Sequence, residues 1–210
     1  NLDPNSPGLE RARRVRSGAA SPSVQETPRS GAVDGYRDSS EIDELLVRVA
    51  EEYPDLCRRV ELGVSGQGRP ISALVITDFP EEKEPEPVVG VLGAMHGDEP
   101  VSAEVPLRLA SHLLSRYHED AAARALVDNT ELWVVPCLNP DGRDANSRFL
   151  HGGMDLNRAF PDGIEDSVGT PWQWSVPAAV PRSPEATAIM DWAARVRPSL
   201  GGSFHSGATV

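Results

Sequence analysis

The sequence predicts an α/β fold, in which a mixed and mostly parallel sheet carries helices on both faces. Short apolar runs that are typical of buried strands alternate along the chain with longer segments of helical periodicity. The first two predicted strands are joined by the turn sequence SGQG at residues 65–68, as in an antiparallel hairpin, so the sheet is expected to be mixed. The chain has 210 residues, of which 39% are apolar and 25% are charged, as in a globular protein.

The first part of the chain combines a low-complexity arm with the first three elements. Residues 1–35 hold prolines among Ser, Gly, Ala and Arg without apolar periodicity, so they are expected to form a disordered arm or linker. A helix is predicted from Ser39 or Ser40, which can cap it, to Pro54, which ends it. Its apolar residues follow the i, i+3, i+4, i+7 rule and are Ile42, Leu45, Leu46 and Val49. Strands are predicted at 58–64 and 69–77.

The rest of the chain supplies the centre of the predicted sheet. The runs VVGVLGA at 88–94 and ELWVVPC at 131–137 are apolar throughout, as strands buried on both faces are. Helices are predicted at 101–117, despite Pro106, and at 119–127. Residues 139–183 are rich in Gly and Pro and are expected to be irregular. A helix at 184–196 and a strand at 200–205 complete the prediction, and the fold is expected to be incomplete at its C-terminus.

Composition excludes several classes of function. The charge of −12, from 20 basic and 32 acidic side chains, argues against a nucleic-acid partner, which usually needs a basic face. No apolar run reaches the roughly 20 residues of a membrane-spanning helix, so no membrane span is expected. The two cysteines, Cys57 and Cys137, are too few for a disulfide-rich scaffold or a CxxC zinc site. The sequence predicts no particular oligomeric state.

The motif HGDE at residues 96–99 directly follows the buried strand 88–94 and precedes a helix. Ligands of open α/β sheets bind at the carboxyl ends of such strands. His96 and Glu99 can both reach one ion there, and zinc accepts imidazole nitrogen and carboxylate oxygen. The alternative is a histidine that is simply hydrogen-bonded near a helix start. His205, at the end of the last predicted strand, is the candidate for the third ligand that a catalytic zinc site needs.

Polar residues between these histidines offer further chemistry. The sequence NPDG at 139–142 is a good turn, and this can be its whole role. In the sequence DLNR at 155–158, Asn157 and Arg158 could grip a carboxylate, and Asp155 could orient a metal-bound imidazole. Arg148 could stand over a polarised carbonyl and stabilise its developing negative charge.

Taken together, HGDE, NPDG, Arg148 nine positions before the Asn of DLNRAFPD, and SFHSG resemble the zinc metallocarboxypeptidases. The HGDE form and the DLNRAFPD segment most resemble the subfamily of carboxypeptidases N, E, M and D. The resemblance covers residues 36–210 and implies a partial catalytic domain, the N-terminal part of a zinc carboxypeptidase-like fold. It implies a hydrolase that removes C-terminal residues from peptides or proteins by metal-activated water.

The resemblance also implies a role for each site residue. His96, Glu99 and His205 would bind one Zn²⁺ per chain, a His₂Glu set that is already known from carboxypeptidase A. Asp155 would hydrogen-bond His96, and Arg148 would hold the oxyanion of the scissile carbonyl. Asn157 and Arg158 would bind the C-terminal carboxylate of the substrate, so the partners are peptide or protein C-termini.

The sequence departs from the family in two places. Arg143 and Asp144 follow NPDG where the family usually has an aromatic residue and Glu. The general-base glutamate, the capping tyrosine and the residues that select the substrate side chain would lie beyond His205, so this chain is expected to lack them. Glu185 is interpreted as a first-turn helix residue favoured by the helix dipole, and not as the base.

Two other functions stay open. One is a related zinc acyl-amino-acid hydrolase of the aspartoacylase or succinylglutamate desuccinylase type, which shares an HGNE-like motif and DLNR. The other is a non-catalytic relative that binds peptides. The resemblance further implies a secreted protein or one of the secretory pathway, although the chain shows no signal peptide.

Overall fold

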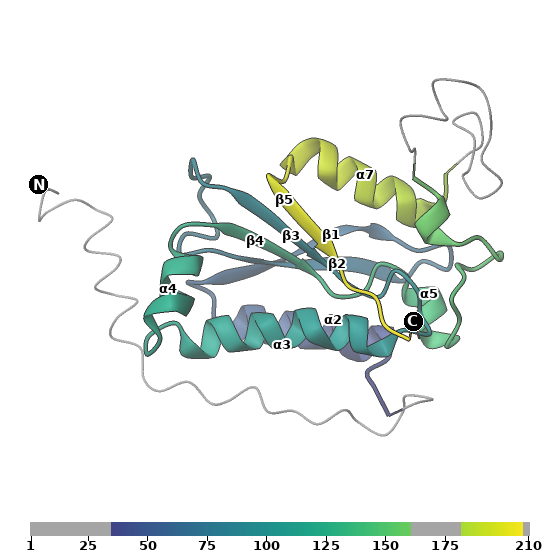
Figure 1. The fold of residues 1–210 in the computed structure, drawn as a ribbon, viewed down its shortest axis with the longest axis horizontal. Coiled ribbons are helices and arrows are strands. Elements are labelled where there is room, and N and C mark those ends of the chain that lie inside the picture. Colours follow the sequence, from purple (N-terminus) through teal and green to yellow (C-terminus); the bar gives the residue numbers. More distant parts are fainter. Residues whose placement is uncertain (1–34, 161–181, 208–210) are drawn as a thin grey trace, which may run out of the picture.

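The computed structural model describes residues 35–160 and 182–207 of the chain. Within them, one five-stranded sheet has the strand order β1-β2-β4-β3-β5. Helices α2, α3 and α4 cover one face of this sheet and α7 covers the other (Figure 1). The predicted α/β class, with helices on both faces, is therefore confirmed.

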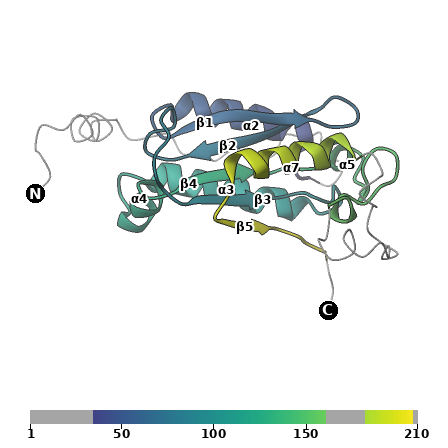
Figure 2. The same cartoon turned by 90° about the horizontal axis from the view of Figure 1, so that it is seen from above.

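The strand directions confirm the mixed, mostly parallel sheet. β1 (Cys57–Val64) and β2 (Pro70–Ile76) form the predicted antiparallel hairpin, and β2 also pairs antiparallel with β4 (Glu131–Val135). β3 (Val88–Leu92) pairs in parallel with β4 and with β5 (Leu200–Ser203). Four of the five strands thus run in one direction and only β2 is reversed. β1 and β5 form the two edges of the sheet (Figure 2).

Helix α2 (Ser39–Glu52) begins one residue earlier than the capping serines predicted. Asp38 is its N-cap, and a capping box joins Asp38 and Glu41: the Asp38 carboxylate accepts from the Glu41 N–H, and the Glu41 carboxylate accepts from the Asp38 N–H. The predicted apolar stripe is the buried face of this helix: Ile42, Leu45, Leu46 and Val49. The helix ends before Pro54, as expected.

Helices α3 (Pro100–Arg116) and α4 (Ala121–Val127) complete the layer on the face of α2. Their buried residues join those of α2 and of strands β2 and β4 in one apolar cluster. Helix α3 runs without interruption through Pro106, whose missing N–H removes one backbone hydrogen bond. The predicted boundaries of α3 hold to within one residue at each end.

Helix α7 (Pro184–Val196) covers the opposite face of the sheet, with Ser183 as N-cap. Its Trp192 lies directly on Gly90 of β3, where an added β-carbon would come within 2.7 Å of the indole ring. Glycine at position 90 therefore lets the helix approach the sheet closely. Trp192 is 3% exposed and belongs to the second apolar cluster of the molecule.

The segment expected to be irregular contains two short helices in its described part. These are α5 (Pro140–Asp144) and the 3₁₀ helix η1 (Leu156–Arg158). Asn139 and Pro140 were expected to form a turn, but Asn139 is the N-cap of α5 and Pro140 its first residue, a position where proline is favoured. The rest of the irregular prediction, 161–181, lies outside the described residues, as does nearly all of the predicted arm 1–35.

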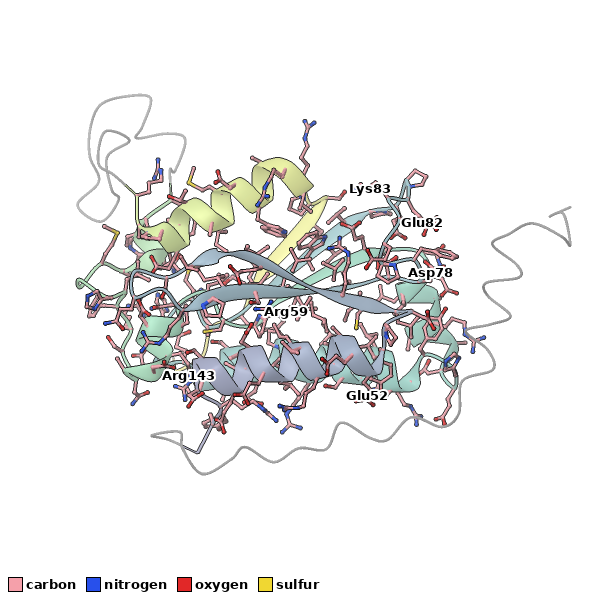
Figure 3. All side chains as sticks on the ribbon, turned by 180° about the vertical axis from the view of Figure 1, so that it is seen from behind. Glu52, Arg59, Asp78, Glu82, Lys83 and Arg143 are labelled. Atoms are coloured by element: carbon pink, nitrogen blue, oxygen red, sulfur yellow. The ribbon has the colours of Figure 1, made fainter. Side chains whose placement is uncertain are left out.

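No helix in the described ranges is both long and apolar enough to span a membrane. Three carboxylates lie close together after β2, where oxygen atoms of Asp78, Glu84 and Glu86 are within 4.8 Å of one another. Figure 3 shows Asp78 at the end of the molecule opposite Arg143. Burial, together with the negative charges of Glu84 and Asp128, raises the pKa of Asp78 to about 7.

This raised pKa predicts a pH dependence of stability. Because the usual pKa of aspartate is about 3.9, the folded chain binds more protons at Asp78 than the unfolded chain between about pH 4 and pH 7. The titration of Asp78 therefore lowers the free energy of unfolding as the pH rises from about 4 to about 7. Asp78→Asn should raise the melting temperature at pH 8 and raise it less, or not at all, at pH 5.

Thermal unfolding followed by circular dichroism at both pH values checks this prediction. Asp191→Asn, on the exposed side of α7, is the matched control and should give the same small change at both pH values. An equal effect of Asp78→Asn at pH 5 and pH 8 would contradict the assignment.

Candidate metal centre and active site

Two adjacent parallel strands bring the predicted ligands together. Leu92 of β3 is in register with Ser203 of β5, so the carboxyl ends of the two strands lie side by side. His96 follows the first strand after a short turn, and His205 follows the second. Ala94, in that turn, has a φ of +40°, a conformation that is uncommon outside glycine. The turn redirects the chain so that His96 and Glu99 meet His205.

Glu99 lies at the centre of this group. Its Oε1 is 2.8 Å from Nδ1 of His96, and its Oε2 is 3.0 Å from Nδ1 of His205. The two imidazole rings are 4.9 Å apart between centroids. Glu99 is the N-cap of α3 but makes no capping hydrogen bond with its side chain, because the carboxylate is turned toward the histidines.

The far side of His96 is held by Asp155, as the resemblance implied. Nε2 of His96 lies 3.1 Å from Oδ1 of Asp155, and His96 is 2% exposed. When Nε2 of His96 donates its proton to Asp155, Nδ1 carries a lone pair, which faces the Glu99 carboxylate. Two acceptors in that position favour a cation between them, and imidazole nitrogen with carboxylate oxygen is the donor set of zinc. The residues therefore fit a zinc ion.

The electrostatics keep both carboxylates ionised. Burial alone would raise the pKa of Glu99, but the N–H of Ser206 and the two histidines lower it below its usual value. Burial is likewise outweighed at Asp155, where the N–H of Asn157, the Arg148 guanidinium and His96 lower the pKa. A carboxylate must be ionised to bind a metal ion, as Glu99 would, or to orient a metal-bound imidazole, as Asp155 would.

Arg148 contacts the two carboxylates of the site, Asp155 and Glu99. Its Nε and Nη2 are 3.1 and 3.0 Å from Oδ2 of Asp155, and its Nη1 is 3.8 Å from Oε1 of Glu99. The side chain is 39% exposed, so the guanidinium is accessible at the edge of the metal-ligand group. Its position suits a cation that stabilises negative charge developing beside the metal.

Asn157 and Arg158 stand on the same short segment, in helix η1. Asp155 is the N-cap of this helix and accepts from the N–H of Asn157 at 2.9 Å, so one carboxylate fixes His96, Arg148 and the start of η1. Asn157 and Arg158 are both exposed. Nη1 of Arg158 donates to the carbonyl of Asn157 at 3.0 Å, and among the described residues neither side chain is hydrogen-bonded to Arg148.

Several buried polar residues around the site were not anticipated. Asp141 of α5 accepts from Ser65, Gln67 and Arg69 of the β1–β2 turn. Glu185 stands in the first turn of α7, as predicted, but it is buried and accepts from the N–H of Gly66. These contacts hold the β1–β2 turn against α5 and α7. The sequence separations of 72 to 119 residues explain why no local pattern signalled them.

Comparison with known proteins identifies the class. The family model described as zinc carboxypeptidase matches residues 42–210, and the chain belongs to this family. The chain is 33% identical to carboxypeptidase SOL1 of Arabidopsis thaliana over 88% of its own length and 36% of that protein's. It is 31% identical to carboxypeptidase M of Mus musculus, over 83% of the chain and 39% of the relative.

The fold agrees with this family. The solved structure of carboxypeptidase A from Helicoverpa armigera matches with a TM-score of 0.66 and 27% identity, over 86% of the chain and 49% of that structure. Other matching relatives are carboxypeptidases D and E, in agreement with the predicted subfamily resemblance. The chain therefore spans less than half the length of these relatives.

The position of Asp155 predicts a specific loss of metal affinity. Asp155→Asn keeps the size of the side chain but removes the charge that orients His96 and pairs with Arg148. Loss of such a partner typically weakens metal binding by about 10- to 100-fold, and we expect that range here. Competition with a chromophoric zinc chelator measures it. Asp43→Asn, which breaks an ion pair with Arg59 away from the site, is the control and should leave zinc affinity unchanged. Equal affinities of both variants would contradict the role of Asp155.

Proposed function

We propose that the protein is a zinc-dependent metallocarboxypeptidase that removes C-terminal residues from peptides or proteins. The observation that carries this proposal is the convergence of His96 and His205 on the carboxylate of Glu99, with Asp155 on the outer nitrogen of His96. His96, Glu99 and His205 would hold one zinc ion per chain. The family is zinc-dependent, which supports the choice of metal.

Zinc bound at this position supplies a Lewis acid for a water molecule and for the scissile carbonyl. The protein's own residues orient this chemistry. Asp155 fixes the ring of His96 so that Nδ1 faces the metal position, and it holds Arg148 on the same side. Arg148 donates to the carbonyl oxygen of the substrate and stabilises the oxyanion as it forms.

Asn157 and Arg158 give the proposed enzyme its exopeptidase character. A free C-terminal carboxylate needs paired donors, and an amide side chain beside a guanidinium supplies them. Both residues are exposed, and both are anchored to the site through the N-cap Asp155. A peptide bound there by its carboxylate would present its last peptide bond to the metal and Arg148.

The general base of the proposed reaction is expected in the part of the protein that follows His205 in the relatives. Glu185 does not take that role in our proposal, because its carboxylate is buried and accepts a hydrogen bond from the N–H of Gly66. The relatives reported above are carboxypeptidases, which favours this function over the acyl-amino-acid hydrolase. The full ligand set favours an enzyme over a peptide-binding relative.

A pair of matched peptides tests the proposal. The zinc-loaded full-length protein is incubated with one peptide in two forms, one with a free C-terminus and one with an amidated C-terminus. Mass spectrometry should show stepwise loss of single C-terminal residues from the free form only. Cleavage of both forms alike, or hydrolysis of N-acetylaspartate or N-succinylglutamate without peptide cleavage, would contradict it.

We also propose that the protein is secreted or enters the secretory pathway, on the basis of family membership alone. Fractionation of the source cells with an antibody against the chain tests this proposal. Recovery of the protein only in the cytosolic fraction would contradict it.

A further inference from the structure

We propose that Arg143 is a positioning residue for the metal centre, which holds the turn between His96 and Glu99 in the geometry that binds the ion. Nothing in the family resemblance assigns this role, because Arg143 stands where the family usually has an aromatic residue. The inference rests on the proposed zinc site. Arg143 acts through the backbone of Gly97, which lies between the ligands His96 and Glu99 in the sequence.

The first support is a pair of hydrogen bonds that fixes Gly97 on both sides. Nη1 of Arg143 donates to the carbonyl of Gly97 at 3.0 Å, inside the protein. The N–H of Gly97 donates to the carbonyl of Ser147 at 2.9 Å. The N–H of Ser147 in turn donates to the carbonyl of Gly142 at 2.8 Å. Both polar backbone groups of Gly97 are thus held by the segment that begins with α5.

The second support is the place of Gly97 in the motif, directly after the ligand His96. Gly97 has no β-carbon, so its backbone has access to more conformations than any other residue type. It stands between His96 and Asp98, and a rotation of its peptide groups would move Nδ1 of His96 away from Glu99. Metal sites tolerate ligand displacements of only about 0.5 Å. The hydrogen bonds to Gly97 therefore hold the backbone next to His96, while Asp155 holds its ring.

The third support is the connection from Arg143 to the other end of the motif. Nε of Arg143 donates to the carbonyl of Arg37 at 2.9 Å, and the side chain of Arg37 pairs with Glu104 of α3. Helix α3 begins at Pro100, and Glu99 is its N-cap. The Arg143 guanidinium thus connects the turn that carries His96 to Arg37, which is anchored on the helix that Glu99 precedes.

The chemistry of the side chain explains why arginine suits this place. Arg143 is 3% exposed and reaches two carbonyls that lie in different directions. A guanidinium offers several N–H donors in a rigid planar fork, whereas the ammonium of lysine is a single point charge on a flexible stem. Lysine at position 143 can keep the charge but cannot reproduce both contacts in the same geometry.

The test measures metal binding in the purified protein, apart from catalysis. Arg143→Met keeps the length of the side chain and removes both donors, and Arg143→Lys keeps the charge. Zinc affinity is measured by chelator competition, and the absorption spectrum of the Co²⁺-loaded protein reports the ligand geometry. Arg59→Met is the control, since it breaks an ion pair of α2 with β1 that does not touch the site.

We expect Arg143→Met to weaken zinc binding about tenfold or more, as loss of an orienting partner does, and to shift the Co²⁺ spectrum. Arg59→Met should lower the melting temperature but leave zinc affinity and the Co²⁺ spectrum unchanged. If Arg143→Met does not fold, the zinc affinity of Arg143→Lys tests the proposal instead. This variant should also bind zinc more weakly than the wild type.

Wild-type zinc affinity in a folded Arg143→Met, or in Arg143→Lys where the Met variant does not fold, would overturn the positioning role and leave the proposed function intact. Absence of zinc binding in the wild-type protein would instead overturn the proposed function, and the positioning role with it. The two failures are therefore distinguishable.

Discussion

Replacing His96 with alanine is expected to abolish tight zinc binding. His96 is one of the three ligands that the described residues bring together at this site, and it is both buried and oriented by the Asp155 carboxylate. Loss of an orienting partner alone costs about 10- to 100-fold in metal affinity, so loss of the ligand itself should exceed 100-fold. Two remaining ligands, Glu99 and His205, leave an open and weak site.

Chelator competition measures this loss, and elemental analysis after dialysis against metal-free buffer confirms it. His112→Ala is the matched control, because His112 lies exposed on α3, outside the ligand group. That variant should keep the zinc content of the wild type. Full zinc retention in His96→Ala would show that the ligand assignment is wrong.

Replacing Gly97 with alanine is expected to have the largest effect on stability among the changes considered. An added β-carbon would lie 1.9 Å from the carbonyl carbon of Gly142 and 2.2 Å from the N of Arg143. Both are backbone atoms of α5, so the turn or the helix must move to relieve the overlap. Overpacking of this kind costs about 1–3 kcal/mol or more, and here the shift also displaces His96 and Glu99.

Gly97→Ala should therefore lower the free energy of unfolding and weaken zinc binding together. Denaturant unfolding of the metal-free protein gives the first quantity, and chelator competition gives the second. Gly202→Ala serves as the control, since a β-carbon there would meet nothing within 4 Å, and its effect should stay within about 0.5 kcal/mol. A Gly97→Ala protein as stable as the wild type would contradict the close packing of the turn on α5.

The sequence was sufficient to predict most of the fold because its signals are local. The apolar spacing of α2 and the all-apolar runs of β3 and β4 each lie within one element, and the structure confirms them. Helix α5 was missed because Asn, Pro and Gly favour a turn and a helix start alike. Only the packing of α5 against Gly97 and the β1–β2 turn distinguishes the two outcomes.

The candidate site divides in the same way. The spacing of His96 and Glu99 and the strand-end position of His205 were readable from the sequence, and the structure brings the three together. The contact of Asp155 with His96 was expected only from the family resemblance. The buried role of Arg143 gave no signal beyond its departure from the family pattern, because its partners lie 46 and 106 residues away. The functional roles of these residues stay predictions.

X-ray absorption at the zinc edge of the metal-loaded protein tests the ligand assignment most directly. The account predicts a shell of nitrogen and oxygen atoms at about 2.0–2.1 Å, with the outer scattering of two imidazole rings and no sulfur. Removal of His205 by alanine substitution should leave the scattering of one ring. A sulfur shell at about 2.3 Å, which would place zinc on Cys57 or Cys137, would contradict the centre built by His96, Glu99 and His205.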